Sequence, residues 1–346
     1  MDFDCKCKRA WRVFETVNVK ILIVKLGAAG DVLRTTALAE AIANRYKNSQ
    51  IDWLTEESMA ELLVGNSRLR NVFYISEPEK WLGQHYDLII NLDADYEISH
   101  AITEMKPKRI IGTYTSNGEL LYTKDSSYWF DMSLLSKHGK EKADLLKANN
   151  RKSYQKIWHD IIGLSDKKHR PHFPLDARHR KFASSFARYH GIKPKNRVIA
   201  VNTGAGQRWL HKKLGIADTV RLLNHVNNRE PENKILLMGG PTEALRNFKI
   251  RRQAPFVIDA TTRSMRELAS MIYLCDTLIT TDSLPLHIGT ALGKKVIAFF
   301  SPTSPWEIEL YDNGAKVLPT KGCLACYHHK CPRPPQYDLK NISELI

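Results

Sequence analysis

The sequence predicts an α/β protein built as two Rossmann-like domains whose parallel sheets face each other across a cleft. Short apolar runs, typical of strands buried on both faces, alternate with segments of helical periodicity. The alternation occurs in two series, 19–112 and 197–299, which are separated by a polar segment with two prolines, 165–178. A length of 346 residues also fits two domains. We therefore expect an N-terminal domain at 1–170 and a C-terminal domain at 171–346.

The first predicted strand and helix begin the N-terminal domain. An apolar run at 21–26 is followed by a turn with Gly27 and Gly30 and then by a helix-period pattern. Asp31 lies where this helix begins. It is either a capping residue, since Asp is favoured there, or a carboxylate displayed at the C-terminal edge of the sheet, where such folds bind ligands. The Gly-x-x-Gly turn lacks the full dinucleotide-binding and P-loop patterns, so it does not decide between the two.

The N-terminal domain continues with strands expected at 51–55, 71–75, 86–92 and 108–112, and a helix at 57–64. Residues 113–170 then break the rhythm, because they interleave aromatic and basic side chains. We interpret them as a helical insertion that faces the cleft and a bulky substrate. The same composition occurs in nucleic-acid-binding segments, but no RNP, KH or zinc-finger spacing supports that interpretation.

The C-terminal domain has strands expected at 197–202, 234–238, 256–258, 277–280 and 295–299, and helices at 216–227, 242–252, 264–274 and 284–292. Two loops that follow these strands are rich in glycine. The loop 202–213 combines glycines, which let backbone N–H groups approach an anion, with cationic side chains. In the loop 238–243, Glu243 can accept hydrogen bonds from ribose hydroxyls.

A third loop, 280–305, contains a helix start, where Ser283 or Asp282 is the expected cap and Pro285 a favoured first-turn residue. A helix start binds anions readily, and His287 follows on the first turn. Taken alone, each loop is explained by an ordinary structural role: glycines in a turn, a helix cap or a buried histidine. Three such loops at one sheet edge instead predict a nucleotide diphosphate site. The residues expected to bind it are Thr203, Gly204, Arg208, Lys212, Met238, Gly239, Gly240, Glu243, Asp282, Ser283, Leu284 and His287.

Charge and composition describe the class of protein and its partners. With 43% hydrophobic and 26% charged residues, the chain is globular, and no apolar run is long enough to span a membrane. The N-terminus lacks the apolar core of a signal peptide, so we expect a cytoplasmic protein. A net charge of +15 favours an anionic partner, which is nucleic acid, phosphorylated substrates or an anionic membrane contacted peripherally at its inner face.

Taken in order, the motifs KLGAAGDVLRTTAL, GAGQRWLHKK, MGGPTE, TTDSLPLHIGTAL and FFSPTSP resemble glycosyltransferase family 9, the heptosyltransferases of bacterial surface polysaccharide. The resemblance implies the GT-B fold, with the donor nucleotide in the C-terminal domain and the acceptor mainly against the N-terminal one. It implies an inverting transfer without a catalytic metal or other cofactor, in which Asp31 is the general base and Lys212 binds donor phosphate. The family's Asp-x-Gly-x-x-His motif maps onto Asp282, Leu284 and His287.

Leu284 replaces the usual glycine of that motif and narrows the approach to phosphate, and Leu214 stands where a tryptophan is common. The expected donor is a nucleotide sugar, with ADP-heptose first. The acceptor is a glycan, lipid-linked molecule or protein, met by Gly27, Gly30 and Arg34. Two other functions stay open. One is a basic nucleic-acid-binding module, although no nucleic acid is expected as a partner, and the other is a non-catalytic sugar-nucleotide-binding protein.

Two further patterns involve metal-ligating residue types. Asp93-Ala94-Asp95 is similar to a D-x-D metal motif, but it follows an N-domain strand away from the donor loops, which favours a strand-end cap or an acceptor contact. Of the six cysteines, Cys275 is expected to be a buried structural thiol. Cys323, Cys326 and Cys331 have the spacing of a structural zinc or iron site, which needs a fourth ligand, or they form only a reduced loop.

Overall fold

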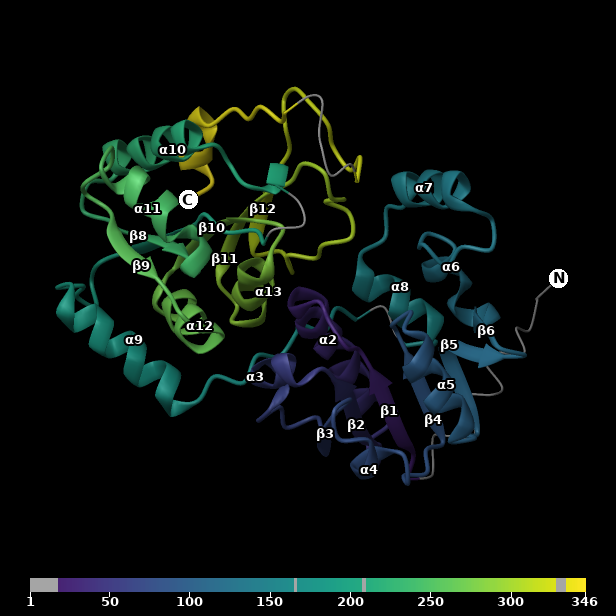
Figure 1. The fold of residues 1–346 in the computed structure, drawn as a ribbon. Helices are drawn as coiled ribbons and strands as arrows, with labels where there is room; N and C mark the ends of the chain where they lie inside the picture. Colours follow the sequence, from purple (N-terminus) through teal and green to yellow (C-terminus); the bar gives the residue numbers. More distant parts are fainter. Residues whose placement is uncertain (1–17, 165–166, 207–209, 328–333) are drawn as a thin grey trace. The chain divides into compact units, whose positions relative to one another are not determined.

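The computed structural model describes residues 18–164, 167–206, 210–327 and 334–346 (Figure 1). The chain divides into two compact units after Pro174, inside the segment expected to be the linker. Each unit contains one six-stranded sheet. Among the described residues, no helix combines the length and the apolar character that crossing a membrane requires.

The first unit has the strand order β3-β2-β1-β4-β5-β6, in which only β6 runs antiparallel to its neighbour. Its strands are β1 (Lys20–Val24), β2 (Gln50–Thr55), β3 (Asn71–Tyr74), β4 (Leu88–Asn91), β5 (Arg109–Ser116) and β6 (Glu119–Tyr122). Its helices are α2 (Ala29–Arg45), α3 (Ala60–Leu63), α4 (Pro78–Trp81), α5 (Tyr96–Glu104), α6 (Ser127–Phe130), α7 (Lys140–Asn149) and α8 (Tyr154–Ile161). The strand order reverses between β1 and β4, so their C-terminal ends form the edge where open α/β sheets bind ligands.

The segment 113–170 is less uniformly helical than the sequence pattern suggests. Its first ten residues complete β5 and form β6, and the two strands are joined by Asn117 and Gly118, both with positive φ. Asn-Gly is the preferred pair for such a tight hairpin turn, because both positions need the left-handed conformation. The remainder is helical as expected, and α8 packs against α2.

The second unit has the order β12-β11-β10-β7-β8-β9, and all its strands are parallel. Its strands are β7 (Val198–Asn202), β8 (Lys234–Gly239), β9 (Ile258–Thr261), β10 (Thr277–Thr281), β11 (Lys295–Phe299) and β12 (Gly314–Val317). Its helices are α9 (Ala177–Tyr189), α10 (Ile216–Arg229), α11 (Ala244–Arg251), α12 (Met265–Leu274) and α13 (Leu284–Ala291). Here the order reverses between β7 and β10, so the loops after these two strands meet at the ligand edge.

Helix α9 and strand β12 are two elements that the sequence patterns did not predict. Helix α9 begins immediately after Asp176, whose side chain accepts hydrogen bonds from the backbone N–H groups of Arg178 and His179. The helix packs against α12 through a narrow stripe that includes Ala183, and most of its other side chains are exposed. A helix with so few buried residues gives a weak periodic signal in the sequence.

Candidate active site

An ion pair between Lys212 and Asp282 connects the loops that follow β7 and β10 in the second unit. Lys212 Nζ lies 2.8 Å from Asp282 Oδ2 and donates a second hydrogen bond to the Asp282 backbone carbonyl at 2.9 Å. Burial alone would raise the pKa of Asp282, but the charges of Lys212 and His287 outweigh it and lower the pKa to about 2. The pair therefore holds one fixed positive and one fixed negative group at the ligand edge of this sheet.

Glu243 forms a second ion pair at the same edge. Its Oε1 accepts a hydrogen bond from Lys213 Nζ at 2.7 Å, and its Oε2 accepts from the Gly240 N–H at 3.1 Å and from the Thr242 hydroxyl at 3.0 Å. Burial would raise the pKa of Glu243, but the hydrogen bonds from Lys213 and Thr242 lower it. These contacts favour the ionised form of the Glu243 carboxylate and hold it in one position.

Two glycines leave the space that Glu243 occupies. A Cβ on Gly239 would lie 2.8 Å from the Glu243 Cβ, and one on Gly204 would lie 3.1 Å from its carboxyl group. Thr203 fixes the strand end beside them, because its hydroxyl donates to Asn247 Oδ1 at 2.6 Å and lies 3.1 Å from a second acceptor, the Met238 carbonyl oxygen. The Met238 side chain is fully buried in the core.

Helix α13 begins next to Asp282. Ser283 is its N-cap residue, but the Ser283 hydroxyl donates to the Thr281 carbonyl at 3.1 Å and makes no capping hydrogen bond to the helix. Leu284 and Pro285 follow, and proline has no N–H. This helix start therefore offers fewer N–H groups to an anion than most, and Lys212 supplies the positive charge beside it. His287 is buried on the same helix.

In the first unit, Asp31 lies in the first turn of α2, close to the ends of β1 and β4. The N-cap residue is Ala28, so the interpretation of Asp31 as a capping residue is not supported by the geometry. Arg34 Nη2 lies 2.9 Å from Asp31 Oδ1, and the Asp31 side chain remains 40% exposed. The Arg34 guanidinium stacks on the ring of Tyr154 at 3.9 Å, a cation–π contact that joins α2 to α8.

A partly buried ion pair, which the sequence patterns did not predict, lies at the same strand ends. Lys25 Nζ lies 2.6 Å from Asp93 Oδ1, and the other Asp93 oxygen accepts the Leu26 N–H. Burial raises the pKa of Asp93, an effect that Lys25 opposes and the nearby charge of Asp31 reinforces. Asp95 instead caps α5 by accepting the Ile98 N–H at 2.9 Å. The Asp-Ala-Asp sequence therefore contains one cap and one ion-paired residue.

The structure thus brings the predicted residues together in two groups. Gly27, Gly30, Asp31 and Arg34 lie in the first unit, and the donor-loop residues Thr203, Gly204, Lys212, Met238, Gly239, Gly240, Glu243, Asp282, Ser283, Leu284 and His287 lie in the second. Arg208 lies outside the described residues, as does Cys331. Cys323 and Cys326 are partly buried and form no disulfide with a described residue. The described residues contain no group of three or more His, Cys, Asp or Glu side chains arranged to hold a metal.

Comparison with known proteins identifies the class. The sequence model of glycosyltransferase family 9 (heptosyltransferase) matches residues 79–336, about three quarters of the chain. The chain therefore belongs to glycosyltransferase family 9, as its motifs indicated.

Individual relatives agree with this assignment. The lipooligosaccharide heptosyltransferase 2 of Campylobacter jejuni serotype O:6 is 35% identical over 96 residues, which are 24% of this chain and 29% of that protein. The match thus spans less than a third of that relative's length. The lipopolysaccharide core heptosyltransferase OpsX of Haemophilus influenzae is 21% identical over 324 residues, 88% of this chain and 86% of that protein.

Solved structures share the fold. A family 9 glycosyltransferase from Veillonella parvula has a TM-score of 0.69 at 19% identity, over 88% of this chain and 87% of that one. Escherichia coli WaaC with ADP-2-deoxy-2-fluoro heptose has a TM-score of 0.55 at 15% identity, over 86% and 92%. The iron-containing dodecameric glycosyltransferase TibC of enterotoxigenic E. coli has a TM-score of 0.54 at 10% identity, over 94% and 72%. The expected GT-B class, two parallel-sheet α/β domains, is confirmed.

Proposed function

We propose that the protein is an inverting glycosyltransferase that transfers a heptose from ADP-heptose to a hydroxyl of a bacterial surface glycan. The observation that carries this proposal is the Lys212–Asp282 ion pair at the point where the strand order of the second sheet reverses. The ADP-heptose analogue named in the E. coli WaaC structure supports the choice of donor. Because Asp31 and the donor residues belong to different units, we propose that transfer requires both units to contact the substrates.

In this proposal, Lys212 stabilises the leaving diphosphate. Negative charge grows on the β-phosphate as the glycosidic bond breaks, and a fixed cation lowers the energy of that transition state. Lys212 has three donors, so it can turn one toward phosphate while another stays on Asp282. Glu243, held by Lys213, would accept hydrogen bonds from the ribose hydroxyls. Since lysine supplies the positive charge, we propose that the reaction proceeds without a metal and is insensitive to EDTA.

Asp31 is the proposed general base. Its partly exposed carboxylate can reach a substrate hydroxyl, and its position in the first turn of α2 favours the ionised form. Arg34, buried between Asp31 and Tyr154, would hold the carboxylate in one orientation. As the acceptor oxygen attacks the anomeric carbon, its proton passes to Asp31, and the leaving group departs as ADP from the opposite face of the sugar.

We further propose that the acceptor is lipid-linked and that the protein meets it at an anionic membrane. Helix α9 supports this proposal. It exposes Arg180, Lys181 and Arg188 together with two aromatic side chains, Phe182 and Tyr189, the latter 86% exposed. Basic and aromatic side chains exposed on one helix are typical of contact with anionic lipid surfaces.

Cys323 and Cys326 are proposed to bind a structural zinc or iron ion with Cys331. Neither Cys323 nor Cys326 is in a disulfide with a described residue, and both lie on one short loop, which suits two of the four ligands of such a site. The ion would connect the loop to the rest of the C-terminal segment and would take no part in transfer.

Thermal-shift titration followed by a transfer assay tests the proposed function. ADP and ADP-heptose are expected to raise the melting temperature, since a ligand that binds only the native state stabilises it, whereas UDP-glucose and GDP-mannose serve as mismatched donors. Release of ADP that depends on acceptor would then establish transfer. If no nucleoside diphosphate at millimolar concentration shifts the melting temperature, the proposal is wrong. Binding without turnover would instead favour the non-catalytic sugar-nucleotide-binding protein.

A further inference from the structure

Arg246 is a partly buried cation beside the donor loops that has no predicted role. It lies on α11, one turn after Glu243, and its Nη2 donates hydrogen bonds to the Leu214 carbonyl and, at 3.3 Å, to the Thr219 hydroxyl. Burial lowers the pKa of Arg246, and the charge of Glu243 only partly offsets this. No carboxylate among the described residues forms an ion pair with it. A guanidinium is costly to bury, so its position calls for an explanation.

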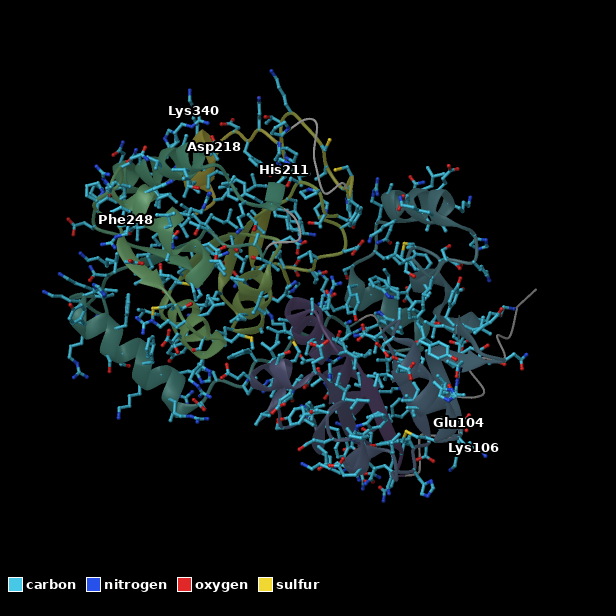
Figure 2. All side chains as sticks on the ribbon, viewed as in Figure 1. Glu104, Lys106, His211, Asp218, Phe248 and Lys340 are labelled. Atoms are coloured by element: carbon cyan, nitrogen blue, oxygen red, sulfur yellow. The ribbon has the colours of Figure 1, made fainter. Side chains whose placement is uncertain are left out.

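The contacts of the neighbouring loop, residues 210–214, explain the position of Arg246. Residues 210–214 carry both lysines of the site and are held at four consecutive positions. The backbone carbonyl of His211, which is labelled in Figure 2, accepts a hydrogen bond from the Ser301 hydroxyl at 2.8 Å. The backbone carbonyl of Leu214 accepts a hydrogen bond from Arg246. Between them, the Lys212 and Lys213 side chains are bound to carboxylates.

These four contacts respond differently to a bound donor. A phosphate group competes with Asp282 for Lys212, and a ribose hydroxyl competes with Lys213 for Glu243. Each of these ion pairs then shares one group with the donor, so both side-chain contacts weaken without being broken. The two contacts to backbone carbonyls involve no group that the proposed donor would bind, so they persist. Ser301 and Arg246 therefore hold the loop through carbonyl groups for which the donor does not compete.

We infer that Arg246 is a positioning residue that holds the Lys212–Lys213 loop against α11 so that both lysines are oriented before the donor arrives. The inference rests on the proposed function for the identity of the donor. A hydrogen bond from a charged donor is stronger than one between neutral groups, and the same Nη2 also donates to the Thr219 hydroxyl, in the first turn of α10.

The test is Arg246→Met, with Arg252→Met as the control at the exposed end of the same helix. The control is expected to match the wild type. Arg246→Met should weaken ADP binding by roughly tenfold, as loss of a charge-assisted hydrogen bond implies, while kcat at saturating donor changes less than about threefold. KM for the donor should rise in parallel. Amide exchange at 210–214 should also accelerate in the ligand-free protein.

Ser301→Ala provides a second variant in case Arg246→Met does not fold. It removes the other backbone contact and should produce the same changes in exchange and affinity. Wild-type affinity and wild-type exchange in a folded Arg246→Met protein would overturn the inference. If the wild type itself binds no nucleoside diphosphate, the proposed function fails instead, and the exchange measurement still decides whether Arg246 holds the loop.

Discussion

Arg34 Nη2 lies 2.9 Å from Asp31 Oδ1, one turn earlier on α2, while the same guanidinium stacks 3.9 Å from the centre of the Tyr154 ring. The Asp31 side chain is 40% exposed and that of Arg34 only 8%. The carboxylate is therefore accessible, but its orientation is set by a residue that cannot move without disturbing α8. This arrangement suits a base that must meet a substrate hydroxyl in one geometry.

Asp31→Asn should lower kcat roughly 100-fold or more while leaving ADP affinity within about twofold, because the amide cannot take a proton. Stability should fall by about 1 kcal/mol, since the cap is Ala28, the ion pair is partly exposed, and Arg34 keeps its contact with the Tyr154 ring. Steady-state kinetics, ADP titration and thermal unfolding measure the three quantities. The exposed Glu57→Gln is the matched control. Near-normal turnover in Asp31→Asn would rule out its role as the base.

Two substitutions at Tyr154 distinguish the packing of its ring from the hydrogen bond of its hydroxyl. Tyr154→Phe loses the 2.8 Å bond to the Thr35 hydroxyl and should cost about 1 kcal/mol, with turnover preserved because Arg34 keeps its stacking surface. Tyr154→Ala removes a fully buried ring and should cost about 3–5 kcal/mol and reduce kcat as well. Urea unfolding and kinetics at saturating donor distinguish the two. Equal turnover in both variants would mean that Arg34 needs no support from α8.

The Lys212–Asp282 ion pair predicts a non-additive double mutant. Lys212→Ala leaves a mostly buried carboxylate without its cation and should destabilise the protein by roughly 2–3 kcal/mol. Adding Asp282→Asn should recover much of that stability, because the unpaired charge is gone, but it should not recover ADP binding. Urea unfolding and ADP titration of the single and double variants test both points. Wild-type ADP affinity in Lys212→Ala would exclude it as a phosphate ligand.

Much of this site could be predicted from the sequence, because polar residues that directly follow buried strands of one parallel sheet must share its C-terminal edge. Asp31, Lys212 and Asp282 all come after such strands, so their place at a sheet edge can be predicted without knowledge of the strand order. The Lys25–Asp93 pair cannot be found in this way, since 68 residues separate the two and they meet only because β4 lies beside β1.

Two other features do leave a signal in the sequence. The pair Asn117-Gly118 is a strong hairpin marker, and Asp176 followed by His179 forms a capping box at the start of α9. Arg246 gives no such signal, because the sequence of α11 does not distinguish it from the exposed basic residues of the same helix. Its contact with the Leu214 carbonyl depends on the tertiary structure.

The lowered pKa of Asp282 predicts an acid-sensitive contribution to stability. Its folded-state value is about 2, below the ordinary value of 3.8, so ionisation stabilises the folded protein above pH 4 and this contribution disappears as the pH falls toward 2. Asp282→Asn removes it. The stability difference between wild type and variant should shrink by about 1 kcal/mol between pH 5 and pH 3, measured by urea unfolding. A constant difference over that range would contradict the assignment.

The described cysteines lie in different environments and should therefore differ in their reactivity toward a thiol reagent. Burial raises the pKa of the Cys275 thiol to about 12, so it should react with a thiol reagent only when the protein unfolds. Cys323 and Cys326 are partly exposed and form no disulfide with a described residue, and without a metal they should react in the native protein. If they bind the proposed zinc or iron ion, their reaction should require a chelator, and about one equivalent of metal should accompany protein purified without an affinity tag.

Loss of the metal should lower the melting temperature, because binding energy in a structural site contributes to folding, while turnover at saturating substrate stays unchanged. Cys323→Ser should abolish the metal, whereas Cys275→Ser should leave it bound. Less than about 0.2 equivalents of zinc or iron, together with immediate reaction of both loop thiols, would show that the segment is only a reduced loop.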